Sequence, residues 1–277
     1  MPSKTVAFFM LEIVVLGVFA IGLIGSVAFW LQGSAGGRRL PFWDKAWHVL
    51  GRVKLIFHGA TLREFLLDWL LQRRLLAAGR LRWLMHICFF WSFIILFFVG
   101  SVGLMLAERG LLPITKDDPW FAFVNDFAGA MALFAVAIAL YRRFILKENV
   151  VKTFAEDIVL VVLLAVIVLS GYALESARLI AHQAPGHVAR YSFVGYPLSL
   201  ALRGASLDWW GAESAIWWVH VVGGMSFVAY LPYSKMFHLI ATPFALAANT
   251  VEARKREYVT QQRHKDTERP RNVVLDG

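Results

Sequence analysis

The sequence alternates between long apolar stretches and segments rich in charge. Five stretches of about twenty residues or more carry almost no charged side chain: Val6 to Trp30, Trp83 to Leu106, Trp120 to Tyr141, Ile158 to Ala177 and Ala215 to Ile240. Each is long enough to cross a hydrocarbon layer of about 30 Å as a helix. Because backbone polar groups in lipid must be satisfied within the segment, the pattern predicts an all-α integral membrane bundle of five transmembrane helices.

The composition agrees with this pattern, since 58% of the residues are hydrophobic and only 17% are charged. Such a balance is typical of membrane proteins. The first apolar stretch is too long for a secretory signal peptide, and only Lys4 precedes it as a basic residue. We therefore expect a retained helix and no separate soluble domain.

Basic residues divide unevenly between the two sides of the predicted bundle. Segments 33–82, 142–153 and 246–277 hold ten, four and seven Lys and Arg residues, against six on the opposite side. By the positive-inside bias, the N-terminus lies outside and the C-terminus lies in the cytoplasm. The net charge of +9 is therefore a topology signal, and no nucleic-acid partner is expected. We expect a multi-pass protein of a prokaryotic inner (cytoplasmic) membrane.

The same pattern divides the chain into regions. Residues 1–250 form one transmembrane domain, and residues 251–277 form a basic cytoplasmic tail, whose hydrophilic composition from Arg254 onward is typical of disorder. Within the domain, residues 33–82 interleave Trp, Leu and Phe with arginines, which favours amphipathic helices on the cytoplasmic interface. Residues 178–212 form an external loop rich in aromatic side chains, which suits the outer membrane boundary.

The single cysteine, Cys88, lies inside the second apolar stretch. One cysteine excludes a disulfide framework, an iron–sulfur cluster and a CxxCH haem-attachment motif within this chain. Any such cofactor must therefore belong to another subunit.

Three histidines lie at matched positions in the apolar stretches. His220 and His238 are eighteen residues apart, about five turns, so on one straight helix their side chains would face the same way and lie roughly 27 Å apart. His86 lies about one turn inside the second stretch, at the depth of His238. Two imidazoles at one depth on different helices fit the axial ligands of one haem iron, which then carries electrons without binding oxygen. A polar packing contact is the alternative for each histidine.

Other candidate side chains have two interpretations each. His182 and His187, in the external loop, are either ligands of a cofactor near the outer surface or solvated loop residues. Glu12 and Asp126 lie one to two turns from the outer side, where they either take protons from a quinol or hydrogen-bond a neighbouring helix. Arg82 is at the depth of a haem propionate on the cytoplasmic side, or is a topology signal alone.

Two further features are less specific. Gly100, Gly223 and Gly224 would leave space for a flat porphyrin, and they equally favour bare helix packing. His48 and His58 lie in a basic neighbourhood that suits the membrane interface better than a transmembrane wall.

The segment WWVHVVGGMSFVAYLPYSKMFHLIATPFALA resembles the last transmembrane helix of the gamma subunit of respiratory nitrate reductase and its relatives. In that family a histidine, an eighteen-residue step, a Pro-Tyr/Phe-Ser-Lys/Arg turn and a second histidine recur. The segment RLRWLMHICFFWSF looks like the branch found in heterodisulfide-reductase-like complexes, including the transmembrane redox complexes of sulfate reducers. The resemblance covers most of the chain as a five-helix plan, and the fifth stretch is its specific part.

The resemblance implies a dihaem cytochrome b that exchanges electrons with a quinone pool and a cytoplasmic iron–sulfur subunit. By the family pattern, His86 and His238 hold the cytoplasm-proximal haem b. The distal haem b would use His220 and a histidine at the position that is Leu96 here. Three alternatives follow for the missing ligand. His182 or His187 supplies it from the external loop, or another weak ligand serves. In the third, the outer haem is absent and His220 contacts a quinone.

We therefore expect a membrane subunit of a respiratory redox complex that transfers electrons between quinone, or a periplasmic multihaem cytochrome c, and a cytoplasmic iron–sulfur protein. A proton-linked transporter is one alternative. The sequence argues against it, because it shows neither the paired broken helices nor the inverted repeat that are typical of transporters. A cofactor-free membrane anchor is the other, and it leaves the placement of the three histidines unexplained.

Overall fold

The computed structural model consists of helices and turns throughout the part of the chain that it describes. The described residues are 2–30, 41, 43–44, 47, 51, 59–147 and 155–268. The chain divides into two compact units. Unit 1 comprises Met1–Ile21 and Leu75–Ser234, and unit 2 comprises Gly22–Arg74 and Lys235–Gly277.

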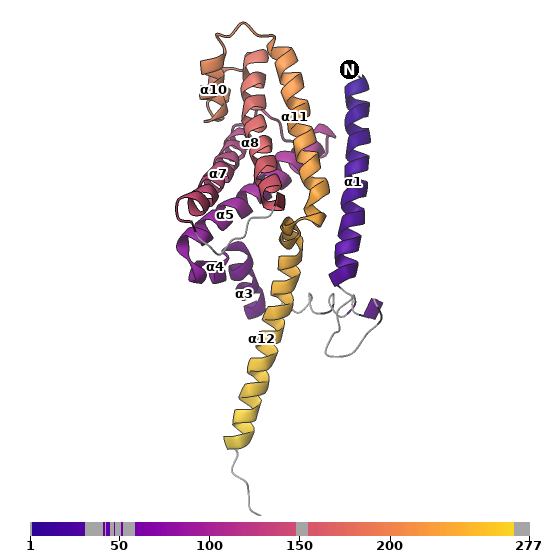
Figure 1. The fold of residues 1–277 in the computed structure, drawn as a ribbon, viewed down its shortest axis with the longest axis vertical. Coiled ribbons are helices and arrows are strands. Elements are labelled where there is room, and N and C mark those ends of the chain that lie inside the picture. The colour runs from indigo at the N-terminus through magenta and orange to yellow at the C-terminus, as the bar shows by residue number, and fades with distance from the viewer. Residues whose placement is uncertain are drawn as a thin grey trace, which may run out of the picture. The chain divides into compact units, whose positions relative to one another are not determined.

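Unit 1 holds most of the long helices (Figure 1). They are the first part of α1 (Pro2–Trp30), α5 (Arg80–Ile94), the π-helix η2 (Ile95–Gly103), α6 (Leu104–Glu108), α7 (Pro119–Phe144), α8 (Ala155–Ala181), α9 (Gly186–Ala189), α10 (Gly195–Leu202), α11 (Trp209–Tyr230) and the 3₁₀ turn η3 (Leu231–Tyr233). The segments α5, η2 and α6 follow one another without a loop and form one continuous helical rod.

Five helical segments among the described residues are long and apolar enough to cross a membrane: Val6–Phe29, Arg80–Glu108, Pro119–Phe144, Val159–Ala181 and Trp209–Tyr233. For four of the five segments, both ends lie within a few residues of the predicted ends, and the fifth segment begins and ends earlier than predicted. The prediction of an all-α bundle with five transmembrane helices is therefore confirmed. Which terminus faces which side stays a prediction.

The ends of α7 illustrate why these helices begin and end where they do. Pro119 occupies a first-turn position, where a helix needs no N–H from the residue. The side chain of Asp118 just before it accepts a hydrogen bond of 2.7 Å from the backbone N–H of Thr115, which closes the preceding turn. Arg142 and Arg143 lie in the last turn, where cations interact favourably with the helix dipole.

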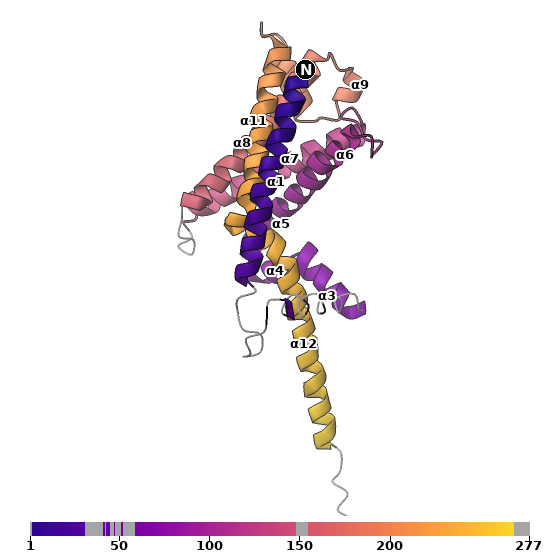
Figure 2. The ribbon, with the colours of Figure 1, turned by 90° about the vertical axis from the view of Figure 1, so that its right-hand side faces the viewer.

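The core of unit 1 lies where α8 packs against α7, α10 and α11. The helices α7, α8 and α11 lie close to one another in both ribbon views (Figure 1 and Figure 2). Ala132 of α7 and Val168 and Tyr172 of α8 form its buried apolar cluster. Ala128 and Ala135 on α7 are completely buried. Small side chains such as these let transmembrane helices approach each other closely.

The second transmembrane segment contains nine residues of π-helix in place of an uninterrupted α-helix. Within it, the Ser101 hydroxyl donates to the Leu96 carbonyl at 3.1 Å. A Cβ atom on Gly100 would lie 2.6 Å from the Asn125 Oδ1 atom of α7, so a larger residue there would require the Asn125 side chain to move. The sequence did not reveal this widened segment.

The fifth stretch is not one straight helix, which corrects the prediction for Ala215 to Ile240. Helix α11 ends at Tyr230, and two short 3₁₀ turns, η3 and η4 (Lys235–Phe237), follow it. Pro232 lacks the N–H that would continue the helix, and Ser234 is fully extended at φ −106° and ψ 170°. The five-turn argument for a shared face of the two histidines is therefore wrong, since it requires an unbroken helix.

Unit 2 contains α3 (Gly59–Leu70) and α12 (His238–Glu268), which pack on each other. The Asp68 carboxylate of α3 accepts hydrogen bonds from Arg73 at 3.1 Å and Arg74 at 2.7 Å, which closes the turn into α4 (Arg73–Ala78). The tail continues α12 as a helix to Glu268, so the expectation of disorder is wrong for residues 254–268.

Parts of the predicted cytoplasmic regions lie outside the described residues. They include His48, His58, most of the segment between residues 31 and 58, and residues 269–277. Within the described part, α3 carries an apolar face with Phe65 stacked on Trp69 at 5.6 Å between ring centroids, as an interfacial helix requires. The division at residue 250 stays a prediction.

Candidate functional site

The imidazole of His220 lies against the backbone of α8. Its Nδ1 atom is 3.0 Å from the Ile167 carbonyl oxygen and 3.1 Å from the Ser170 hydroxyl. A carbonyl oxygen only accepts hydrogen bonds, so Nδ1 carries the ring proton and donates it. The other ring nitrogen, Nε2, therefore keeps its lone pair, which is the form that binds a metal.

Two neighbouring residues of α8 make this contact possible. Gly171 leaves room for the ring, since a Cβ atom there would lie 3.2 Å from His220 Cε1. Ser170 donates its own hydroxyl proton to the Ile167 carbonyl at 3.1 Å, the usual bond of a serine to its own helix. The ring of His220 is thus held by the adjacent helix, which the spacing of histidines along one stretch could not reveal.

His238, the first residue of α12, has the same arrangement by a different route. Its Nδ1 atom lies 2.6 Å from the Lys235 carbonyl oxygen, three residues earlier in the same turn. By the same argument Nδ1 is the donor, which in a neutral imidazole leaves the lone pair on Nε2. Both histidines of the fifth stretch therefore present a ligand-type nitrogen.

His86 lies half-buried in α5, within unit 1, whereas His238 lies in unit 2. Their pairing on one iron stays a prediction. Arg82 lies four residues before His86 on α5, and i and i+4 residues share one face of a helix. Beside this turn, the buried Arg142 of α7 places its Nη1 atom 3.6 Å from the sulfur of Met85.

The chemistry of these side chains is compatible with the axial ligands of a haem iron. Within the described ranges, no three His, Cys, Asp or Glu side chains group together as an ion such as zinc requires. A haem iron takes four ligands from its own ring and needs only axial ligands from the protein. Neutral imidazoles whose Nδ1 proton is held by a carbonyl are suited to that task.

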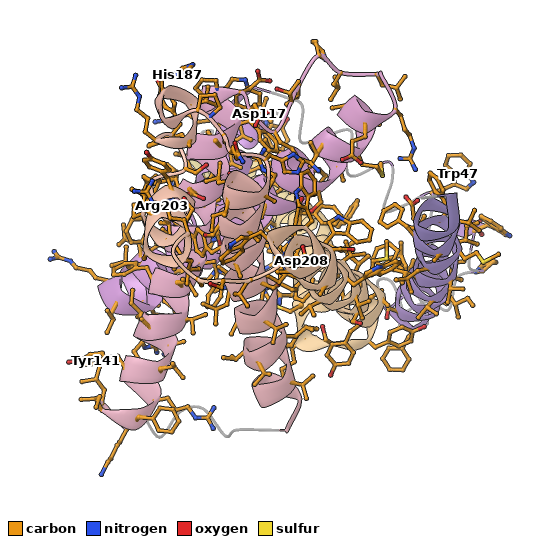
Figure 3. All side chains as sticks on the ribbon, turned by 90° about the horizontal axis from the view of Figure 1, so that it is seen from above. Trp47, Asp117, Tyr141, His187, Arg203 and Asp208 are labelled. Atoms are coloured by element: carbon orange, nitrogen blue, oxygen red, sulfur yellow. The ribbon has the colours of Figure 1, made fainter. Side chains whose placement is uncertain are left out.

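The two loop histidines lie at the end of unit 1 that carries residues 109–118 and 182–208, which we call the loop end (Figure 3). His187 is exposed in α9. The Nε2 atom of His182 is 3.3 Å from a Glu213 carboxylate oxygen, and its ring centroid is 4.4 Å from that of Trp210. Glu213 precedes His220 by two turns, about 10 Å along α11, so this contact holds His182 away from His220.

Glu12 forms an ion pair. Its carboxylate lies 3.3 Å from Arg109 Nη2, and the guanidinium carbon of Arg109 lies 5.7 Å from the Phe9 ring centroid. Phe8 also packs on Trp217, with ring centroids 5.7 Å apart. Glu12 thus helps to attach α1 to the end of α6, in agreement with the structural alternative for this residue.

Asp126 anchors the loop end to the bundle. One carboxylate oxygen accepts hydrogen bonds from the backbone N–H groups of Val194 at 2.7 Å and Gly195 at 3.1 Å. The Tyr172 hydroxyl donates to the Asp126 backbone carbonyl at 2.7 Å. The hydrogen-bonding alternative therefore describes Asp126, although the partner is a loop rather than a neighbouring helix.

Sequence reasoning missed a second polar network beside Asp126. Glu175 of α8 accepts hydrogen bonds from the Ser192 hydroxyl at 2.8 Å and from Arg178 at 3.1 Å, and Arg178 also donates to Asp117 at 2.7 Å. The signal was the Glu–Arg spacing of three residues late in the fourth stretch, which places both charges on one helix face.

The glycines differ in what surrounds them. A Cβ atom on Gly223 would meet Ile167 of α8 at 3.5 Å, so this glycine serves close packing of α8 and α11. A Cβ atom on Gly224 would have none of the described atoms within 4 Å, and Gly224 lies one turn after His220. Gly224 is therefore not packed against another described residue on the side of α11 where it follows His220.

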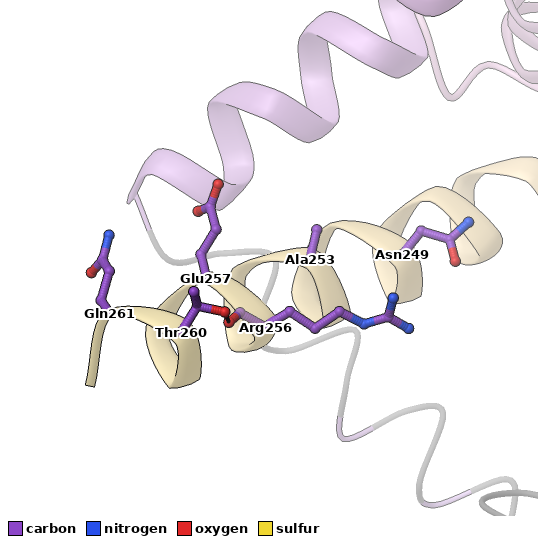
Figure 4. A pocket seen from close by; sticks show the side chains of 6 residues that line it. All are labelled: Asn249, Ala253, Arg256, Glu257, Thr260 and Gln261. Atoms are coloured by element: carbon purple, nitrogen blue, oxygen red, sulfur yellow. Dashed lines mark hydrogen bonds between the residues drawn. The ribbon is translucent and has the colours of Figure 1, made fainter. Parts of the chain in front are cut away.

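A hollow on α12 is lined by Asn249, Ala253, Arg256, Glu257, Thr260 and Gln261 (Figure 4). These side chains include neither an imidazole nor a thiol. The hollow therefore lacks the ligands that a haem iron takes from a protein.

Comparison with known proteins extends these observations. A family model described as nitrate reductase gamma subunit matches residues 70–256. A subunit of the dihydromethanophenazine:CoB–CoM heterodisulfide reductase of Methanosarcina thermophila is 28% identical over 263 residues, which cover 88% of this chain and 91% of that protein. No solved structure matches.

Two longer relatives match over a smaller part. The EtfAB:quinone oxidoreductase of Syntrophomonas wolfei is 25% identical over 57% of this chain. The probable iron-sulfur-binding oxidoreductase FadF of Bacillus subtilis is 30% identical over 61% of this chain. In both cases the match covers 24% of the relative, so these proteins carry much more than the part they share with this chain.

Proposed function

Because this chain belongs to the nitrate reductase gamma subunit family, which is a family of membrane redox subunits, we propose that it carries haem b in a respiratory redox complex. It transfers electrons between the quinone pool, or a periplasmic multihaem cytochrome c, and a cytoplasmic iron–sulfur subunit. The observation that best supports haem is the placement of the Nδ1 atoms of His220 and His238, each against a backbone carbonyl, which directs Nε2 to the role of a ligand.

The inner haem in this proposal is held by His86 and His238, with Arg82 pairing with its propionates. His220 is the ligand of an outer haem, and Gly224, one turn after it, is not packed against another described residue. When bound, each haem supplies one-electron transfer. The protein side chains bind and orient the ring, and the apolar helices around it exclude water.

The second ligand of the outer haem is not an imidazole at position 96. His182 serves only if its contact with Glu213, two turns before His220 on α11, is released, and His187 is the other candidate. The alternative of a single haem, with His220 facing a quinone, stays part of the proposal. Glu12 and Asp126 remain candidates for proton uptake from quinol, although the ion pair of Glu12 and the two N–H bonds of Asp126 favour their structural roles.

The names of the relatives support the partners. One is a subunit of a heterodisulfide reductase, one is a quinone oxidoreductase, and one is an iron-sulfur-binding oxidoreductase. Taken together, these names support our proposal that this chain exchanges electrons between a membrane quinone and an iron–sulfur protein. With the N-terminus outside and the C-terminus in the cytoplasm of a prokaryotic cell, the iron–sulfur protein docks on the basic inner side.

A spectrum tests the proposal. The purified protein is expected to show a b-type alpha band in a reduced-minus-oxidised visible spectrum, and a haem assay gives the number of haems per chain. His86→Ala and His238→Ala should each remove the same haem, because both ligands serve one iron. His264→Ala in the exposed part of α12 is the control and should keep the full haem content.

Two results would overturn the proposal. Absence of any alpha band would show that the protein does not bind haem b, and the cofactor-free anchor and the transporter would then be the functions to consider. An unchanged haem content in His86→Ala shows that the assigned pair of ligands is wrong.

A further inference from the structure

We propose that Ser170 and Gly171 of α8 form a positioning clamp for the His220 ring and so set the potential of the haem that His220 binds. The inference rests on the proposed function, since it concerns the outer haem. No feature of the sequence pointed to these two residues.

The clamp is a three-way contact of polar atoms. The Ser170 hydroxyl donates to the Ile167 carbonyl at 3.1 Å, so its lone pairs face the third group, the Nδ1–H of His220, also at 3.1 Å. The Ile167 carbonyl accepts from the same Nδ1–H at 3.0 Å. The ring proton is therefore shared between two acceptors, both supplied by one turn of α8.

The contact restricts the ring in two ways. The Ile167 carbonyl favours the tautomer in which Nδ1 is protonated, because a carbonyl oxygen only accepts hydrogen bonds. Gly171 places backbone rather than a side chain under the ring, and Cε1 of His220 would lie 3.2 Å from any Cβ atom there. The ring thus lies at a defined depth and angle against α8.

Hydrogen bonding at Nδ1 changes the electron donation of the imidazole to an iron bound at Nε2, and so changes the midpoint potential of that iron. Stronger hydrogen bonding at Nδ1 makes an imidazole a more basic ligand, and a more basic ligand stabilises ferric iron over ferrous iron. Loss of one of the two acceptors should weaken that donation. Ser170 is therefore a positioning residue whose hydroxyl lowers the midpoint potential of the outer haem.

The first test compares midpoint potentials of the full-length protein in membranes. Ser170→Ala should shift the potential of one haem upward and leave the other unchanged. Ser170→Thr, which keeps the hydroxyl, should restore the original value. Ser199→Ala is the matched control, because Ser199 also donates to a carbonyl three residues earlier, that of Tyr196 at 2.7 Å, but lies on α10 rather than beside His220. It should change neither haem.

The second test uses the space under the ring. Gly171→Ala should displace the ring by a few tenths of an ångström and so lower the content of the outer haem or alter its alpha band. Gly17→Ala in α1, where no described atom lies within 4 Å of a Cβ atom, is the control and should retain both haems unchanged.

Failure of this inference is distinct from failure of the proposed function. If His220→Ala keeps every haem, or if Ser170→Ala leaves both potentials unchanged, the clamp is wrong while a haem on His86 and His238 still stands. If the unaltered protein contains no haem, the proposed function itself is wrong.

Discussion

At the scale of single residues, the structure separates side chains that look alike in sequence. Asp126 and Glu12 are both carboxylates in apolar stretches, yet one binds two backbone N–H groups and the other pairs with an arginine. Similarly, Gly223 packs against α8 while its neighbour Gly224 faces open space. Adjacent positions on a helix point about 100° apart, so neighbours in sequence meet different surroundings.

Asp126→Ala gives a prediction at this scale. It leaves the N–H groups of Val194 and Gly195 without their acceptor, and each unpaired buried group costs about 1–3 kcal/mol. We expect a lower melting temperature in detergent micelles, measured by circular dichroism. Phe127→Ala, at the next and exposed position, is the control with little effect. Equal melting temperatures for the two variants would show that Asp126 does not anchor the loop.

At the scale of elements, two departures from regular helix shape the bundle. The π-helix η2 widens the second transmembrane segment and places Gly100 against Asn125 of α7. The 3₁₀ turns after Tyr230 end α11, and the Tyr233 hydroxyl there donates to the Val18 carbonyl of α1 at 3.0 Å. Such π-helical insertions occur often at functional sites, and this one begins one residue before Leu96, where the family pattern has a histidine.

The interlock between η2 and α7 can be tested by a pair of substitutions. Gly100→Ala should destabilise the protein by about 1–3 kcal/mol, because its Cβ atom would overlap the Asn125 side chain. Adding Asn125→Ala should recover most of this loss by removing the overlapping atoms. Thermal unfolding of both single variants and the double variant measures the coupling, with Gly25→Ala as the uncrowded control. Strictly additive losses would show that the two positions do not touch.

At the scale of the whole molecule, the two histidines of the fifth stretch belong to different compact units. His220 lies in unit 1 and His238 in unit 2, before and after the break in the helix at residues 231–237. The His220 ring is therefore positioned by the packing of α8 on α11, and the His238 ring by the turn that begins α12, so in the proposed function the two haem ligands are positioned independently. Substitutions at one site should therefore leave the other haem largely intact.

Orientation gives a prediction for the whole chain. In a Cys88→Ser background, Arg203→Cys at the loop end and Thr260→Cys on α12 both place a thiol on an exposed position. In intact cells a membrane-impermeant maleimide should label position 203 and not position 260, because the positive-inside bias places the loop end outside. Labelling of position 260 alone would show that the predicted topology is reversed, and the iron–sulfur partner would then dock on the side of the loop end.

The sequence by itself determined the five membrane helices, since the thickness of the hydrocarbon layer and the cost of bare backbone polar groups impose length and composition on every span. It also located His86, His220 and His238, because an ionisable side chain stands out in an apolar stretch. Only the tertiary structure decided what each ring touches. The Ile167 carbonyl lies 53 residues from His220, and the N–H groups bound by Asp126 lie 68 and 69 residues away. Contacts of this kind arise when helices pack, and a hydrophobicity pattern carries no information about which faces meet.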